Sequence, residues 1–576
     1  MIALFGRDEC SVLGIASLLD VEKIPYRRVR KLEDGDGELL IVATADLTAL
    51  ETASLERRSA LVLNGGPQFA RQVFGIAASR TSKVACAIDL HDRLWPAPVF
   101  ELARRFGKTA LRIPLAPVCT TEDEPSRGTI VAALHTGCAT LQPAVMRHSR
   151  CVWSSVDLGA AFANLLTESY WPPDEASGAR SAPIPRLRRT AENAYYAAPD
   201  WLRRRVQRRY YARLQQRLDA MDTPSDYPID ATGWLLIELV KHLIRIAAGG
   251  LVRLERWPAP YGAAATLTHD LEPKRYAYTT GLGRLLQRTA TTGHPATLAL
   301  VAQASEQYLS DEVVCRLKPH AIMCHGLTHR GEPVRGRAAV LANLHTARTR
   351  LERCVGRPVL GYRSPRLDRS ADLAWALDQS DFRYDSSYPD VDRENIEHFG
   401  AGVRLNVPYR PLVDGVSGVL RPSRCLELPL SAPDCIQPLF AGEELAGLRA
   451  TVERKAEFIR ATGGLYVALV HAGVFGNRDA AIREAHLDFV CQQLRRADVW
   501  MTGIQDIAQW WTSREALRLS VHGSAVCVTN TGAQPIEGAQ VVVEQGETEI
   551  TLPVPALAPG AQATVTIPQR SSLPAA

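Results

Sequence analysis

The sequence has no long hydrophobic run of the kind that forms a membrane-spanning helix. Its most apolar long stretch, Trp234–Val252, contains Glu238, Lys241 and Arg245, and charged side chains are costly inside a bilayer. The first residues, Met1–Phe5, lead directly into polar and charged positions, so the apolar segment of a signal peptide is missing as well. We therefore expect a cytoplasmic protein without a transmembrane segment.

An excess of one charge and closely paired cysteines are also missing. The 67 Lys and Arg residues nearly balance the 62 Asp and Glu residues, and a formal net charge of +5 over 576 residues does not indicate a nucleic-acid partner. None of the 12 cysteines forms a C-x-x-C pair, which excludes a zinc ribbon and a thioredoxin-type redox motif. We interpret the scattered thiols as reduced and mostly buried.

Several common catalytic signatures are absent: the P-loop, G-x-S-x-G, H-E-x-x-H and the dinucleotide-binding fingerprint. What remains is the composition of an ordinary globular protein, with 46% hydrophobic and 22% charged residues. A chain of this length is expected to form three or four domains.

Residues 1–170 alternate short apolar runs with helical patterns, which is typical of a three-layer α/β domain. The runs that we interpret as strands are Ile2–Phe5, Leu39–Ala43, Ala60–Leu63, Val84–Ile88 and Ile130–Leu134. The pattern resembles flavodoxin-like folds of the class I amidotransferase type. The G-x-C-x-G nucleophile elbow of that family is missing, since the nearest thiol, Cys138, lacks the second glycine. We expect a non-catalytic binding or scaffolding domain.

Residues 171–260 begin with a Pro- and Ala-rich linker and continue into a basic stretch, Arg180–Arg217, with eleven arginines and several aromatic residues. This stretch would suit an anionic glycan, a nucleotide or a membrane surface. We favour a helix with solvated arginines and inward-packed aromatics. The following segment, Trp234–Leu254, has helical hydrophobic spacing and is expected to pack on the next domain.

Residues 261–518 again alternate strands and helices, and this number of strands predicts a β/α barrel. The strand-like runs are Ala263–Thr268, Ala296–Val301, Ala321–Cys324, Gly361–Ser364, Leu426–Leu430, Gly464–Val470 and Val499–Ile504. Residues 519–576 differ, because short β-forming runs alternate with glycine-containing turns. They predict a small Ig-like β-sandwich.

Ionisable side chains follow four of the predicted barrel strands. They are Asp270 and Glu272, His325 and His329, Arg363 and Arg366, and His471. The carboxyl ends of barrel strands form one face, so we expect these groups to converge. The two histidines are four residues apart, so one turn of helix would direct both imidazoles towards a single ion. A carboxylate from Glu272 or Asp270 would complete a metal site with open positions for water and substrate.

In order and spacing, these elements resemble the NodB-homology polysaccharide deacetylases, carbohydrate esterase family 4. The matching stretches are Thr268-His269-Asp270-Leu271-Glu272, a variant D-x-E first motif; His325-Gly326-Leu327-Thr328-His329; Arg363-Ser364-Pro365-Arg366; Glu427-Leu428-Pro429; and Leu469-Val470-His471. The resemblance covers roughly residues 262–510. It implies a distorted β/α barrel and a hydrolase that removes acetyl groups from N-acetylated or O-acetylated sugars of a polysaccharide or glycan precursor.

The resemblance also implies a role for each matching residue. Asp270 would be the general base, held in place by Arg363, and His471 would be the general acid. The backbone N–H of Arg366 would help to stabilise the oxyanion. The metal ligands would be Glu272, His325 and His329, and the cofactor would be a divalent ion, with Zn²⁺ as the expected identity.

Two points of the assignment stay open. Leu271 stands where the family has a second Asp, so Glu272 must supply the metal carboxylate; if its side chain points away, Asp270 would ligate the metal and this motif would supply no base. The residue that orients the general acid is Asp385, Asp390 or Asp392, unless the segment 384–387 is merely a capped turn.

Two other functions compete with deacetylation. A barrel of this kind would also suit hydrolysis of a non-sugar C–N bond. Alternatively, the chain would be a non-catalytic glycan-binding scaffold.

Overall fold

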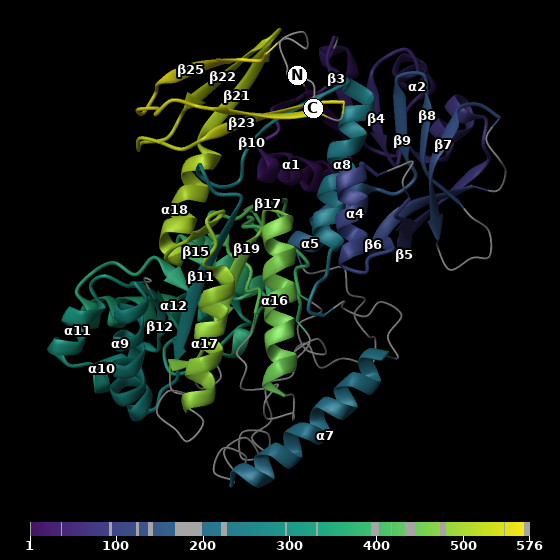
Figure 1. The fold of residues 1–576 in the computed structure, drawn as a ribbon. Helices are drawn as coiled ribbons and strands as arrows, with labels where there is room; N and C mark the ends of the chain where they lie inside the picture. The colour runs from purple at the N-terminus through teal and green to yellow at the C-terminus, as the bar shows by residue number, and fades with distance from the viewer. Residues whose placement is uncertain are drawn as a thin grey trace.

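The computed structural model describes most of the chain, with gaps. The described residues are 2–35, 37–91, 95–121, 126–135, 142–167, 199–219, 227–293, 296–329, 332–392, 402–415, 418–432, 444–472, 480–546 and 548–568. Cys138, the Pro-rich linker and the first part of the basic stretch lie outside them. Figure 1 shows an N-terminal α/β region, a central region of strands and helices, and a small group of strands that ends the chain.

The N-terminal region contains a nine-stranded sheet in the order β2-β1-β3-β4-β9-β8-β7-β5-β6. Its strands are β1 (Ile2–Gly6), β2 (Tyr26–Arg28), β3 (Leu39–Ala43), β4 (Ala60–Leu63), β5 (Ala78–Asp89), β6 (Ala110–Thr121), β7 (Thr129–His135), β8 (Gln142–His148) and β9 (Cys151–Ser154). The five predicted strands are all present. The sheet is parallel from β2 to β9, whereas β8, β7, β5 and β6 add an antiparallel half that the sequence pattern did not predict.

Apart from the edge strand β2, whose residues are half-buried or exposed, the parallel strands of this sheet are buried on both faces. Leu4 and Ile41 face the hydrophobic core that includes α1 (Glu9–Glu22) and α5 (Leu158–Thr167), whereas Phe5 and Val42 face a second core with α2 (Ala49–Leu55). Successive side chains of a strand point to opposite faces of the sheet. A continuous apolar run therefore supplies hydrophobic side chains to the cores on both faces.

Between this region and the centre of the molecule, the described part of the chain contains the helices α7 (Asp200–Asp219) and α8 (Thr232–Ala248). The helix α8 is buried, and its Trp234 ring lies 5.9 Å from that of Phe458 in α16 (Leu445–Ala461); its predicted packing on the next domain is confirmed. The helix α7 differs from the expectation, because its Trp201 and Tyr210 are 65% and 45% exposed. The predicted inward packing is therefore wrong for these two aromatics, because α7 lies apart from the other described helices and strands in Figure 1 and the described core does not cover them.

The central region is built on a curled parallel sheet in the order β18-β15-β14-β13-β12-β11-β19, with β20 also paired to β11. Its strands are β11 (Ala263–Leu271), β12 (Thr297–Leu300), β13 (Ala321–Cys324), β14 (Gly361–Tyr362), β15 (Tyr384–Asp385), β18 (Leu426–Glu427), β19 (Leu465–Leu469) and β20 (Val499–Met501). A parallel bridge between Ala432 and Ala468 brings the segment after β18 beside β19, so the sheet curls towards closure. This is a mixed α/β architecture with a barrel-like sheet.

Helices alternate with these strands along the chain. They are α9 (Leu282–Thr292), α10 (Ala302–Tyr308), α11 (Asp311–Leu317), α12 (Arg337–Val355), α13 (Ala371–Gln379), α16, α17 (Ala480–Leu494) and α18 (Ile504–Glu515). Apolar side chains of the barrel-like sheet, α8 and the N-terminal sheet belong to one continuous hydrophobic core. None of the described helices is both long enough and apolar enough to cross a membrane.

The last strands form two small sheets around their own hydrophobic core. One contains β21 (Leu517–His522), β22 (Ala525–Asn530) and β25 (Gln562–Thr566); the other contains β10 (Leu251–Leu254), β23 (Gln540–Gln545) and β24 (Thr548–Pro553). The strand β10 comes from the segment before the barrel-like sheet and pairs antiparallel with β23. The small module and the segment that precedes the barrel are thus joined by backbone hydrogen bonds.

Candidate active site

The predicted site residues lie at the carboxyl ends of four strands in the curled sheet. Asp270 is the penultimate residue of β11, His325 follows β13, Arg363 follows β14, and His471 is two residues beyond β19. These strands are parallel and β11 is central among them. Their carboxyl ends therefore meet at one edge, as the sequence predicted.

Asp270 is the buried centre of the site, with an exposed fraction of 2%. The Arg363 guanidinium donates a hydrogen bond from Nη1 to Asp270 Oδ1 at 3.4 Å, while Asp270 Oδ2 lies 3.6 Å from His325 Nε2. Burial by itself would raise the pKa of Asp270, but the field of His325 when protonated, the permanent charge of Arg363 and the field of His471 when protonated outweigh it and place this pKa below its ordinary value. The carboxylate is therefore ionised at neutral pH.

His325 is fixed in one tautomer by its backbone partner. Its Nδ1 lies 2.9 Å from the carbonyl oxygen of Arg363, and a carbonyl can only accept, so Nδ1 carries the hydrogen. Burial lowers the pKa of His325 to about 4, so the ring is neutral at pH 7. Its Nε2 lone pair consequently faces the Asp270 carboxylate.

His329 lies beside His325, with ring centroids 4.9 Å apart. Its backbone is in the left-handed region, at φ 60°, and its N–H donates to Glu332 Oε1 at 2.8 Å. A non-glycine residue in this conformation is strained and persists where the surroundings fix it. The two histidines therefore do not lie on a helical turn; a tight turn held by Glu332 brings them together.

Glu272 lies at the exposed edge of the site. Its side chain is 31% exposed, and its Oε2 is 2.7 Å from Lys274 Nζ. Burial acts to raise the pKa of Glu272, but the fields of His471 and Lys274 lower it below its ordinary value. Glu272 is thus ionised, pairs with Lys274, and lies close enough to His471 and His329 to feel their charge when they are protonated.

Arg363 is completely buried and is held by several partners. Besides Asp270, it donates from Nη2 to Thr268 Oγ1 at 3.3 Å and to Ser386 Oγ at 3.0 Å. The next residues form a short turn, Pro365–Leu367, in which Arg366 and Leu367 both have positive φ, at 59° and 58°. The Arg366 side chain is exposed and pairs with Asp368.

Gly326 allows this turn to approach His325. It has φ +75°, and a Cβ at this position would lie 2.7 Å from Pro365 Cγ. Both the backbone conformation and the contact therefore require glycine. The second and third motifs of the sequence are packed directly against each other.

The candidates for orienting the general acid have other partners. Asp390 pairs with Lys455, Asp392 pairs with Arg369 at 2.9 Å, and Asp385 accepts hydrogen bonds from Ser386 and Ser387. The segment 384–387 is not a simple capped turn, because Tyr384–Asp385 forms the strand β15.

A divalent cation fits the donor chemistry of the site. Asp270 Oδ2 and His325 Nε2 both present lone pairs across 3.6 Å, and two ligands about 2.1 Å from one ion lie roughly 3.4 Å apart at a tetrahedral angle. Within the described residues, however, no three His, Cys, Asp or Glu side chains are gathered closely enough to hold an ion as they stand. The carboxylate nearest to His325 is Asp270, whereas the sequence resemblance implied Glu272.

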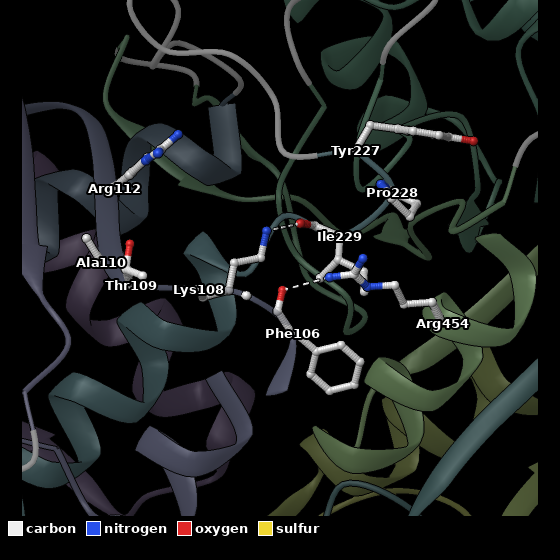
Figure 2. Close-up of a pocket in the computed structure, with 10 residues that line it drawn as sticks. Phe106, Lys108, Thr109, Ala110, Arg112, Tyr227, Pro228, Ile229 and Arg454 are labelled. Atoms are coloured by element: carbon white, nitrogen blue, oxygen red, sulfur yellow. Dashed lines mark hydrogen bonds between the residues drawn. The ribbon is translucent and has the colours of Figure 1, made fainter. Parts of the chain in front are cut away.

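A separate pocket lies away from these residues, at the junction of the N-terminal and central regions. It has a volume of about 230 Å³, and Lys108 and Arg454 reach across it to the carbonyl oxygens of Ile229 and Phe106 (Figure 2). None of the predicted site residues lines it, and its hydrogen bonds tie α16 and the segment before α8 to the N-terminal region.

No protein-family model and no curated protein sequence matches the chain. Among solved structures, similar ones include a putative polysaccharide deacetylase from Mycobacterium smegmatis, at 20% identity and a TM-score of 0.36 over 46% of this chain and 96% of that one. The Puue allantoinase is 15% identical, with a TM-score of 0.35 over 45% of this chain and 93% of that one. Agd3, described as a novel carbohydrate deacetylase, is 11% identical, with a TM-score of 0.38 over 99% of this chain and 98% of that one. Structures similar to this chain thus include carbohydrate deacetylases, and at these values the similarity by itself assigns it no activity.

Proposed function

We propose that this chain is a metal-dependent hydrolase that removes acetyl groups from N-acetylated or O-acetylated sugars of a polysaccharide or glycan precursor. The observation that carries the proposal is the buried, ionised Asp270 held between the Arg363 guanidinium and the neutral His325 ring. A general base, a group that orients it and a lone-pair donor for a cation thereby meet at one point.

The residues divide the work of acyl hydrolysis. Arg363 occupies Oδ1 of Asp270 and so leaves Oδ2 directed towards His325, where it would accept the proton of the attacking water. His471, which is half-buried, would donate a proton to the leaving amine or alcohol. The backbone N–H of Arg366, in its left-handed turn, would donate to the developing oxyanion.

A divalent ion, Zn²⁺ in our proposal, would be held by His325, His329 and one carboxylate. When bound, it would supply Lewis acidity at the acyl carbonyl and lower the pKa of water. Two assignments of the carboxylate are distinguishable. In the first, the Glu272 side chain turns from Lys274 to bind the ion, and Asp270 is the general base. In the second, Asp270 binds the ion, and Glu272 stays paired with Lys274 at the exposed edge of the site.

The test is a panel assay with the purified full chain. We expect acetate release from oligomers of N-acetylated sugars or from an O-acetylated sugar, with a free amine appearing only for the first class. Release of product solely from a non-sugar amide would move the enzyme to the alternative C–N hydrolase class. Glycan binding without any turnover, in the presence of Zn²⁺, would support the scaffold instead.

A further inference from the structure

Two carboxylic side chains are buried next to each other behind Arg363. Asp385 ends β15 and Glu427 ends β18, and the two residues are register partners in the parallel pair. Their exposed fractions are 2% and 1%. Carboxyl groups in such surroundings require hydrogen-bond partners or a change of protonation.

One oxygen of each carboxyl group is satisfied by neighbouring donors. Asp385 Oδ1 accepts from Ser386 N at 2.8 Å and from Ser387 Oγ at 2.5 Å, and Glu427 Oε1 accepts from Tyr388 N at 3.0 Å. The other oxygens, Asp385 Oδ2 and Glu427 Oε2, are buried and receive no hydrogen bond from the described residues. Two ionised carboxylates could only accept, so a proton between these oxygens is what satisfies both.

The electrostatic surroundings agree with a shared proton. Burial raises the pKa of Asp385 to about 6 and, together with the Asp385 charge, raises that of Glu427 well above its ordinary value. Among the described residues, Arg363 is a positive group whose field acts on both carboxyls. The other titratable neighbours, Tyr362 and Cys425, are themselves buried and have raised pKa values, so they remain neutral.

The carboxyl pair is connected to the active site through two serines. Ser386 Oγ accepts from Arg363 Nη2 at 3.0 Å and donates to the carbonyl oxygen of Leu428 at 2.8 Å. Ser387 Oγ donates to Asp385 and accepts from the backbone N–H of Ser364 at 2.8 Å. The Arg363 guanidinium and the Ser364 backbone N–H are therefore both hydrogen-bonded to the serines that follow Asp385.

We propose that Asp385 and Glu427 share one proton and act as a single negatively charged positioning unit, which holds Arg363 and Ser364 so that the guanidinium points at Asp270. This role builds on the proposed hydrolase function. It makes Asp385 a positioning residue for Arg363 rather than the partner of the general acid.

A shared proton predicts an unusual pattern of amide substitutions. In Asp385→Asn, the remaining side-chain oxygen can still accept from Ser386 N and Ser387 Oγ, while the new N–H₂ group donates to Glu427. The amide hydrogen then replaces the shared proton, and the charge of the pair is unchanged. Glu427→Gln is equivalent from the other side. We expect each single variant to keep kcat within about threefold. In Asp385→Asn/Glu427→Gln two N–H₂ groups face each other and the charge opposite Arg363 is lost, so kcat should fall at least about 100-fold with little change in KM.

The matched control uses Asp157, another buried carboxyl whose pKa burial raises to about 6, located in the N-terminal region. It accepts from Ser11 Oγ at 2.6 Å and from Ala160 N at 2.9 Å, so among the described residues its hydrogen bonds come from a hydroxyl and a backbone N–H rather than from a second carboxyl. Asp157→Asn/Glu427→Gln should therefore show the sum of its single effects on kcat, whereas the Asp385–Glu427 combination should not.

Infrared difference spectra of the purified proteins supply a readout that is independent of turnover. At neutral pH the wild type should show one protonated-carboxyl C=O band that disappears in Asp385→Asn and equally in Glu427→Gln. The proposal is overturned if this band survives in both single variants, or if either single variant alone loses as much kcat as the double variant. Should the wild type release no acetate from any substrate, the proposed function fails, while the band still decides whether the proton is shared. Should the double variant not fold, the single variants and the band give the decision.

Discussion

Arg363 Nη1 and Asp270 Oδ1 lie 3.4 Å apart at the carboxyl edge of the curled sheet, and both side chains are almost completely buried. A buried ion pair is costly to desolvate, and removal of one partner leaves the other charge uncompensated. Such a pair is weak evidence for stability. It is more informative about function here, because the second oxygen of Asp270 is left facing His325.

Metal content is the first prediction. Protein prepared with Zn²⁺ is expected to retain about one ion per chain, and His325→Ala or His329→Ala should lose most of it, because each removes a nitrogen donor. His345→Ala, an exposed histidine on α12, is the control and should bind metal normally. Elemental analysis after gel filtration measures the effect. Full metal retention in a His325/His329 double variant would show that the ion binds elsewhere.

The two carboxylates of the first motif give the second prediction. With Asp270 as base and Glu272 as ligand, Asp270→Asn should lower kcat by about 10²- to 10⁴-fold and leave metal bound, since Asn keeps the shape but accepts no proton. Glu272→Gln should instead weaken metal affinity, and excess Zn²⁺ should restore part of the rate. Acetate release and metal occupancy are measured together for both variants. Loss of metal from Asp270→Asn alone would assign Asp270 as the ligand.

The order of these motifs could be predicted from the sequence because each follows an apolar run long enough to be recognised as a strand. Local patterns did not reveal β15, which lies between the polar residues Arg383 and Ser386 rather than in an apolar run, or the pairing of β10 with β23 across nearly 300 positions. The neighbours Asp385 and Glu427 were likewise hidden, since their register depends on which strands become adjacent. The ion pair of Glu272 with Lys274 depends on side-chain rotamers that residue spacing does not specify.

Acid sensitivity is the third prediction, and it concerns the contact between α1 and the segment before the barrel. Glu22 is 1% exposed, and its Oε1 accepts from Arg256 Nη2 at 2.6 Å. Burial would raise the pKa of Glu22, but Arg256, Lys241 and Arg253 lower it from 4.5 to about 2. A depressed folded-state pKa stabilises the protein above the unfolded value, and this contribution is lost as pH falls from about 4.5 to about 2.

The difference between these two pKa values corresponds to a contribution of about 3 kcal/mol to the free energy of unfolding at neutral pH. Denaturant unfolding from pH 7 to pH 3 should therefore show a falling free energy of unfolding, and the slope should be smaller in Glu22→Gln, which starts from a lower value. Glu306→Gln is the control. Glu306 pairs with Arg350 at the surface, where water and salt screen the charges, so this substitution should leave the slope close to that of the wild type. Equal slopes in wild type and Glu22→Gln would contradict the prediction.

Two glycines with the same backbone conformation allow the packing of the site to be tested apart from backbone strain. Gly326 and Gly336 have φ of +75° and +79°, but a Cβ on Gly326 would meet Pro365 at 2.7 Å, whereas one on Gly336 would meet nothing within 4 Å. Alanine at either position should cost about 1 kcal/mol of stability through the positive φ.

Only Gly326→Ala should also displace Pro365 and, with it, Arg366 and the carbonyl of Arg363 that orients His325. A shift of about 1 Å in such a site can lower the rate about 100-fold, so we expect Gly326→Ala to lose kcat and metal affinity while Gly336→Ala keeps both. Thermal unfolding, kcat and metal titration of the two variants provide the comparison, and equal activities would show that the contact between the second and third motifs does not position the catalytic groups.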